Sequence, residues 1–234
     1  AVLQQPIRNT NLVARGTWRA GEHQFTGEAV VSRADSTKSF SPNQLTSSTS
    51  STSPLYNMAY PSTGSSYAYV FDALVKAFPQ LAANRGAPLA LRWRCMPCGN
   101  REIETQADTS RFLAAAEGPL WGGWDYRAGV SAASSDTVST LGGGYFYGKE
   151  LANLVSTGVL NPFLLAGQSQ TPAAMAELDK ISARGAKLYG GKMSMQQVDA
   201  VASGPVFKSG GGEAMAAVGV DIRTEKYQFN GNET

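Results

Sequence analysis

The chain has 234 residues, only 16% of them charged, and a formal net charge of +2. This length suffices for one large domain that buries a core without disulfide staples, and the near-neutral charge argues against a surface built to bind a polyanion. No run of 18 apolar residues occurs, so we expect no membrane-crossing segment and no membrane partner. The sequence begins at Ala1, which fits removal of an initiator methionine or of an export signal.

The first part of the chain predicts a β-hairpin followed by a mobile segment. Two runs with strand-forming residues, 12–19 and 24–33, are separated by a short loop at 20–23. Residues 35–66 then become rich in Ser, Thr and Pro, a composition that buries too little apolar surface to order itself. We therefore expect a single domain over 1–234 with a loop or arm at 35–66, which a neighbouring subunit could order.

A helix and a second hairpin are predicted next. Apolar residues between Tyr67 and Phe78 recur at helical spacing, and Pro79 ends the pattern. The run from Leu89 to Trp93 alternates apolar and polar residues, as does the run around Ile103. Between these runs lies Cys95-Met-Pro-Cys98-Gly99, so the pattern predicts a hairpin with two thiols at its tip.

The order of these elements favours an α+β fold. Asp108 or Thr109 can cap a short helix over 110–117, and a strand over 126–131 would complete the β-α-β-β-α-β order of a ferredoxin-like sheet with helices on one face. Beyond it the sequence predicts a mostly helical C-terminal part, in short pieces that include one opening at Thr171-Pro172 and one opening at Ser194. A long strand from Ala214 to Phe229 ends the chain.

The cysteine turn has three readings. Cys95 and Cys98 have the spacing of a zinc knuckle, and His23, the only histidine, could bring the ligands to three. A redox pair is the second reading, although no helix follows the motif to lower the pKa of the first thiol. The third is a pair of small residues that pack a tight turn or form a local bridge. We favour this third reading and expect no cofactor. The candidate metal ligands are Cys95, Cys98 and His23, and zinc is the candidate metal.

Catalytic signatures are sparse. His23 is the only imidazole for proton transfer near neutral pH, and no Gly-x-Ser-x-Gly elbow accompanies it. Glu102 and Glu104 share a strand face and are expected to lie opposite Arg92 and Arg94. These patterns favour a non-catalytic protein.

The sequence as a whole favours a self-assembling structural subunit. The polar arm, the glycine-rich joints and the terminal strand suit a coat, tube or virion-type shell component that contacts copies of itself, in an extracellular or virion assembly. The first alternative is an enzyme or metal-dependent binding domain centred on the cysteine turn and His23. The second is a single-stranded nucleic-acid-binding module, because arginines and aromatic residues interleave at 15–19, 92–94 and 121–127.

Overall fold

The computed structural model describes residues 5–231 and divides the chain into two compact units. Ala1 lies outside the described residues. Unit 1 contains Gln5, Lys38–Ile103 and Thr140–Ala186, and unit 2 contains Pro6–Thr37, Glu104–Ser139 and residues 187–231. Each unit draws on segments that are far apart in the sequence.

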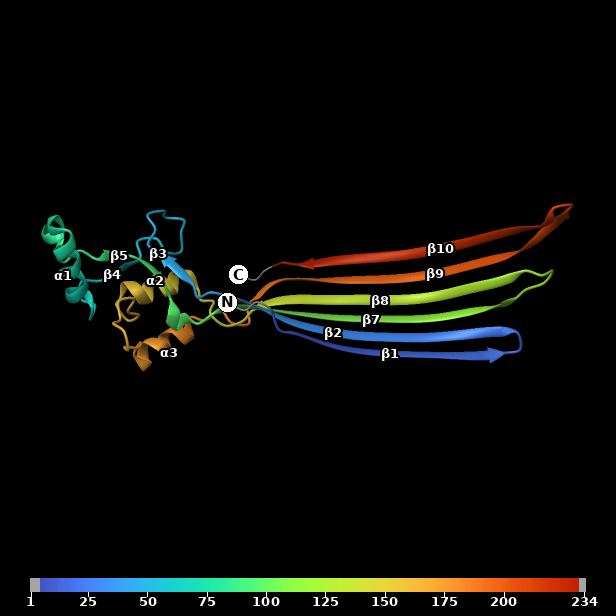
Figure 1. The fold of residues 1–234 in the computed structure, drawn as a ribbon, viewed down its shortest axis with the longest axis horizontal. Helices are drawn as coiled ribbons and strands as arrows, with labels where there is room; N and C mark the ends of the chain where they lie inside the picture. The colour runs from blue at the N-terminus through green and yellow to red at the C-terminus, as the bar shows by residue number, and fades with distance from the viewer. Residues whose placement is uncertain (1–4, 232–234) are drawn as a thin grey trace. The chain divides into compact units, whose positions relative to one another are not determined.

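Unit 2 is built from one antiparallel sheet of three long hairpins (Figure 1). The strand order is β1-β2-β7-β8-β9-β10, so each hairpin lies beside the next one in the sequence. The strand bounds are β1 Ile7–Ala20, β2 His23–Phe40, β7 Arg101–Pro119, β8 Asp125–Leu141, β9 Lys187–Ser209 and β10 Gly212–Asn230. β1 and β10 form the two edges of this sheet.

The outer hairpins have a continuous register. In β1–β2 the pairing runs from Ile7 with Ser36 to Ala20 with His23, and Gly21, with a φ of 61°, provides the left-handed turn residue. In β9–β10 the register shifts once, between Ala214 and Met215. The predicted N-terminal hairpin and the predicted C-terminal strand are thus confirmed.

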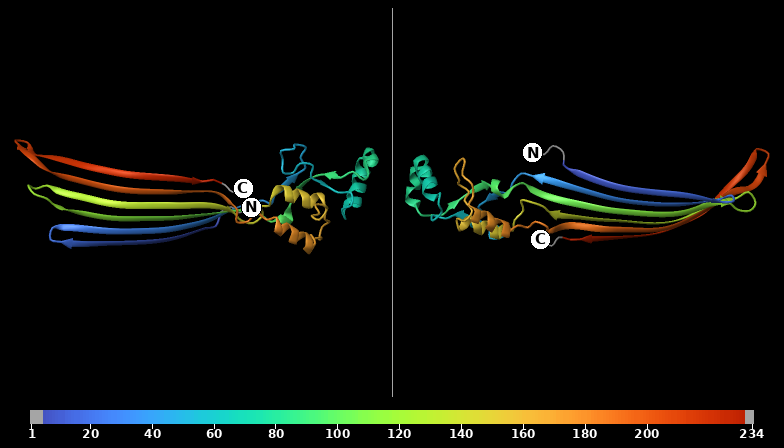
Figure 2. Two further views of the ribbon diagram at one scale, coloured as in Figure 1. Left: turned by 180° about the vertical axis from the view of Figure 1, so that it is seen from behind. Right: turned by 90° about the horizontal axis from the view of Figure 1, so that it is seen from below.

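The sheet of unit 2 is a single layer without a core of its own (Figure 2). Every buried apolar side chain of residues 5–231 belongs to unit 1. Large apolar side chains on the sheet are instead open, for example Trp18 and Ile222, each 66% exposed. Something outside the described chain must therefore cover them if they are to leave water.

Unit 1 packs short elements around a compact core. Its elements are β3 Gln44–Thr46, β4 Ala59–Tyr60, α1 Tyr67–Ala77, η1 Pro79–Asn84, β5 Leu89–Ala90, β6 Arg92–Arg94, η2 Met96–Cys98, α2 Gly148–Ser156 and α3 Pro172–Lys180. Its most buried side chains include Tyr60, Met58, Val155, Leu160 and Leu178. The predicted helix is confirmed as α1. Tyr67 and Phe71 of its apolar stripe are buried, whereas Phe78, the last residue of the predicted stripe, is 52% exposed. Thr171 caps α3 as predicted, because its Oγ1 accepts a hydrogen bond from the Ala174 N–H at 3.1 Å.

The predicted fold class is wrong. The structure is mostly antiparallel sheet, with neither a ferredoxin-like core nor a mostly helical C-terminal part. The predicted helices over 110–117 and from Ser194 lie inside strands β7 and β9. Both segments have neighbours on two sides in the sheet, and this pairing overrides their local helix propensity.

The predicted hairpin around the cysteine turn is also wrong. β5 pairs with β4 and β6 pairs with β3, whereas the segment after the cysteines enters β7 of the large sheet. The expected contact of Glu102 and Glu104 with the two arginines is absent; Arg94 instead donates to Ser41 Oγ at 2.8 Å. The segment 35–66, expected as a loop or arm, contains the end of β2, then β3 and β4, and hydrogen-bonded turns such as Ser53 N–H to Ser50 O at 3.1 Å.

Candidate functional site

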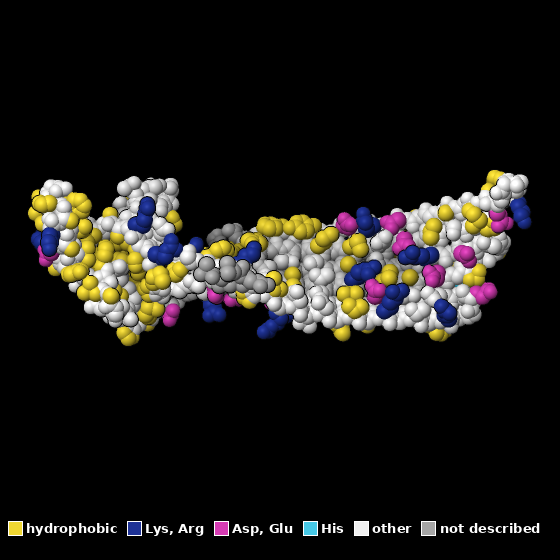
Figure 3. All heavy atoms as spheres, viewed as in Figure 1, with side chains coloured by type: hydrophobic (Ala, Val, Ile, Leu, Met, Phe, Trp, Pro, Cys, Tyr) yellow, Lys and Arg dark blue, Asp and Glu magenta, His cyan; other side chains and the backbone are white. Residues whose placement is uncertain are grey.

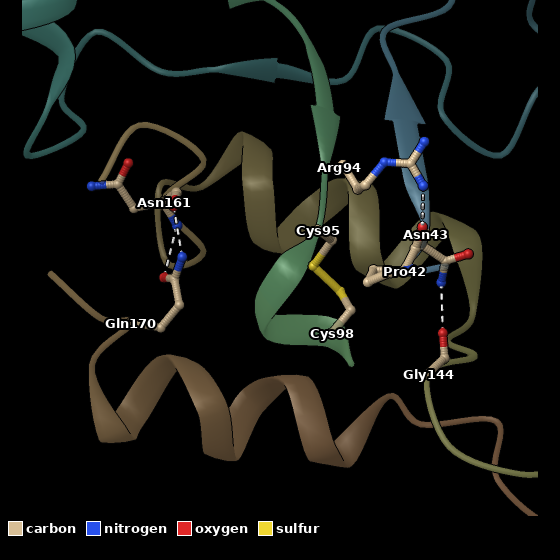
Figure 4. Close-up of a disulfide and its surroundings, with 8 residues drawn as sticks. All are labelled: Pro42, Asn43, Arg94, Cys95, Cys98, Gly144, Asn161 and Gln170. Atoms are coloured by element: carbon tan, nitrogen blue, oxygen red, sulfur yellow. Dashed lines mark hydrogen bonds between the residues drawn. A yellow bond between two sulfur atoms is a disulfide. The ribbon is translucent and has the colours of Figure 1, made fainter. Parts of the chain in front are cut away.

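The two cysteines form a disulfide in unit 1 (Figure 4). Cys95 and Cys98 lie around the short helix η2 with Cα atoms 5.3 Å apart, and both are buried in the core. The Cys95 N–H donates to the Asn43 carbonyl at 2.8 Å. Because bonded sulfurs are not thiolates, they offer no metal ligands in this state. Such bonds persist in oxidising compartments.

His23 belongs to the other unit. It begins β2, and its Nδ1 lies 3.2 Å from the Tyr126 hydroxyl. Gly118 makes room for the ring, since a Cβ atom at position 118 would overlap it. Across residues 5–231 no group of three His, Cys, Asp or Glu side chains could hold a metal ion. The structure therefore does not bring the predicted zinc ligands together.

A groove of about 400 Å³ lies beside the disulfide in unit 1. Its apolar lining includes Trp93, Met96, Pro97 and Met175. The polar side chains at its edge are engaged locally: Gln170 accepts from the Asn161 N–H at 3.0 Å and donates to the Asn161 carbonyl at 2.6 Å. The lining of this groove contains no ionisable residue, so the groove has no group for acid–base catalysis or for binding a charged ligand.

The sheet of unit 2 carries the more extensive feature, because its two faces differ in chemistry. Successive side chains of a strand point to opposite faces. On one face, which we call the apolar face, a groove of about 920 Å³ crosses all six strands. Its lining includes Ala14, Ala29, Phe112, Ala114, Val130, Ala132, Gln196, Val198, Ile222 and Thr224.

An apolar band occupies this face over a nine-residue segment along each strand, with Leu120 and Trp124 just beyond the ends of β7 and β8. The band covers residues 12–20, 23–31, 112–120, 124–132, 196–204 and 216–224. At the alternate positions on the apolar face, these segments hold Ala, Gly, aliphatic or aromatic residues, apart from His23, Gln196 and Thr224. The band therefore contains no Asp, Glu, Lys or Arg on this face.

Aromatic residues gather at the end of the band nearest the hairpin turns. The Trp18 and Phe25 rings stack with centroids 5.3 Å apart. The Tyr126 ring lies beside His23. Trp124 Nε1 donates to the Pro205 carbonyl at 3.1 Å, so its one polar atom is paired.

The opposite face, which we call the charged face, carries interleaved arginines and carboxylates (Figure 3). Arg111 pairs with Glu28 at 2.8 Å, and Arg223 pairs with Glu225 at 3.1 Å. Its charged residues include Arg15, Arg19, Glu28, Arg111, Glu117, Asp125, Arg127, Asp199, Asp221, Arg223 and Glu225. Over the span of the apolar band, charge is therefore confined to one side of the sheet.

The other end of the band, which we call the base margin, is polar on the apolar face as well. Arg33 lies 3.4 Å from Asp35 and 4.0 Å from Asp108. Lys192 and Lys226 lie at this margin on β9 and β10. The apolar face is thus bounded by aromatic residues at one end and by ionic residues at the other.

Sequence reasoning missed this two-faced sheet. The signal was present in β8, where Tyr126, Ala128, Val130 and Ala132 alternate with Arg127, Gly129, Ser131 and Ala133. We expected only a short strand there because alanine and glycine weaken the strand signal.

No helix among the described residues is long and apolar enough to span a bilayer. Comparison of the chain with protein-family models, curated proteins and solved structures found no match.

Proposed function

We propose that this chain is a structural subunit whose sheet lies with its apolar face against the hydrocarbon of a lipid bilayer, while further copies complete its edge strands. The observation that carries the proposal is the band without charge across all six strands, opposite a face rich in ion pairs. This proposal departs from the expectation of no membrane partner. That expectation was based on the absence of a long run of consecutive apolar residues, and such a search does not detect apolar residues at alternate positions of a strand.

The dimensions of the band support hydrocarbon as the covering medium. Nine residues at about 3.3 Å each give a height of about 30 Å, which is about the thickness of a bilayer's hydrocarbon core. Six strands about 4.8 Å apart give a width of about 29 Å, so the band covers roughly 850 Å². This area exceeds the apolar patches of about 300–600 Å² that soluble monomers expose.

The two ends of the band support the same reading. Aromatic rings such as Trp18 and Tyr126 suit the interface between hydrocarbon and water, where an amphipathic ring has both surroundings within reach. Arg33 and its carboxylate partners at the base margin need water or headgroups. Along the strands, the face therefore changes from aromatic to aliphatic to ionic residues, as expected for a segment that runs from one membrane interface through the hydrocarbon to the other.

The edges of the sheet link this reading to self-assembly. In hydrocarbon each unpaired backbone N–H or C=O costs several kcal/mol, and β1 and β10 leave one side of each strand unpaired. β1 runs toward the hairpin turns and β10 runs away from them, so β10 of one copy can pair antiparallel with β1 of the next. Repeated addition of this kind gives a ring or a filament.

A quenching experiment tests the lipid-facing assignment. Tryptophan is placed singly at Ala217, Val218 or Val220, with the native tryptophans replaced by phenylalanine, and the chain is refolded into vesicles with brominated acyl chains. We expect strong quenching at Val218→Trp and Val220→Trp and weak quenching at Ala217→Trp, because position 217 lies on the opposite face. Equal quenching at all three positions would contradict the proposal.

Light scattering of the vesicle-refolded chain after transfer to detergent tests the edge pairing. We expect a defined oligomer over a wide concentration range. If only monomers are found while the quenching pattern is as expected, the proposed pairing between copies is wrong. The edge strands β1 and β10 would then have to pair with strands of another protein.

A further inference from the structure

Two lysines stand together at the base margin of the apolar face. Lys226 lies opposite Ser194 and Lys192 lies opposite Gln228 in the β9–β10 pairing. The two lysines are therefore diagonal neighbours on one face, at a Cα separation of roughly 7–8 Å. Gln196 and Thr224, which lie opposite each other, begin the apolar band on the side of the two lysines that faces the hairpin turns.

These lysines differ from Arg33, the base-margin cation of β2, because neither has an ionic partner among residues 5–231. Arg33 is held by Asp35 and Asp108. Lys192 and Lys226 are exposed, and neither pairs with a carboxylate of residues 5–231. Asp136 of the neighbouring strand β8 lies near this level, because Gly190, two residues before Lys192, approaches Thr137 and Val138. It forms no ion pair with either lysine.

We propose that Lys192 and Lys226 bind the phosphate groups of anionic lipid headgroups, an inference that rests on the proposed function. If hydrocarbon covers the band, the two ammonium groups lie where the acyl chains end and the headgroups begin. A long lysine side chain keeps its stem on apolar surface and its charge in the polar layer. Two adjacent ammonium groups offer six N–H donors to phosphate oxygens, whereas Asp136 alone cannot neutralise both.

The test compares vesicle binding of the full chain with that of a charge-neutral pair. The parent and the double variant K192Q/K226Q are diluted from urea into phosphatidylcholine vesicles with or without phosphatidylglycerol, at low ionic strength, and bound protein is measured by flotation. We expect the variant to lose about 30-fold in binding to the anionic vesicles. Its binding to the neutral vesicles should be unchanged.

The double variant K76Q/K149Q serves as the matched control, because it removes the same charge from exposed positions of unit 1. We expect it to keep the parent's preference for anionic vesicles. Equal binding of the parent to both kinds of vesicle, or equal losses in both double variants, would overturn this inference and leave the proposed function standing. Absence of binding to either vesicle would overturn both.

Discussion

Replacing Ala114 with lysine places a charge inside the apolar band, and the adjacent Ala115→Lys provides a matched control. Ala114 lines the groove on the apolar face, and Ala115 points to the opposite face because the two are consecutive residues of β7. Both lie on an interior strand. The two substitutions therefore differ in the face that receives the charge and in little else.

The expected loss of vesicle binding depends on how far the new lysine lies inside the apolar band. Ala114 is two residues from Phe112, where the band begins on β7, and thus about 7 Å inside a band about 30 Å high. A lysine on a lipid-facing strand costs about 2–4 kcal/mol at the midplane of the hydrocarbon and about 0–1 kcal/mol near its edge. At this intermediate depth we expect about 1–2 kcal/mol, which corresponds to a loss of roughly 5-fold to 30-fold in vesicle binding. Ala115→Lys puts its charge on the face that already carries Asp199, whose carboxylate lies over Gly129, and we expect no more than a twofold change.

The assay is flotation with neutral phosphatidylcholine vesicles, and circular dichroism confirms that both variants retain strand content. Equal binding of the two lysine variants would refute the assignment of the apolar face to hydrocarbon. If a second copy of the chain, and not lipid, packs on the apolar face, the expected result is different. In lipid-free buffer the parent would then form dimers, and Ala114→Lys would dissociate them.

Three further predictions concern unit 1 and are read by urea denaturation. Joint replacement of Cys95 and Cys98 by alanine should cost about 2 kcal/mol, the entropy of a four-residue loop closure, and a reductant should leave this variant unaffected. Leu160→Ala should cost about 2–5 kcal/mol because Leu160 is fully buried, whereas exposed Leu165 should tolerate alanine within about 0.5 kcal/mol. Gly144→Ala should destabilise by about 1–3 kcal/mol, because the residue has a φ of 74° and a Cβ atom there would overlap the Asn100 carbonyl.

Local patterns predicted the elements whose stability is local. The stripe of α1 and the Thr171 cap of α3 are set by residues within a few positions of one another, and both were predicted. The β1–β2 hairpin was predicted for the same reason, since its turn lies at Gly21. These elements need no knowledge of distant segments.

The fold class could not be predicted because the central strands are specified by distant neighbours. β7 pairs with β2 although 60 residues (100 − 40) separate the end of β2 from the start of β7. β7 also contains Leu113-Ala-Ala-Ala-Glu117, a sequence that favours a helix on propensity alone. The disulfide could not be assigned from the sequence for a different reason: the spacing of Cys95 and Cys98 is compatible with a metal site, a redox pair or a local bridge. Only their geometry in the core selects the bridge.

The alternation missed in β7 to β9 has a physical meaning that a search for buried cores does not register. A strand in a water-soluble sheet pairs its apolar face with a core, and unit 2 has none among its described residues. Ordering strands of up to 23 residues costs conformational entropy that backbone hydrogen bonds alone do not offset. The compensating burial must then come from outside the chain, so removing lipid and neighbouring strands together should unfold unit 2 while the disulfide-linked core of unit 1 persists.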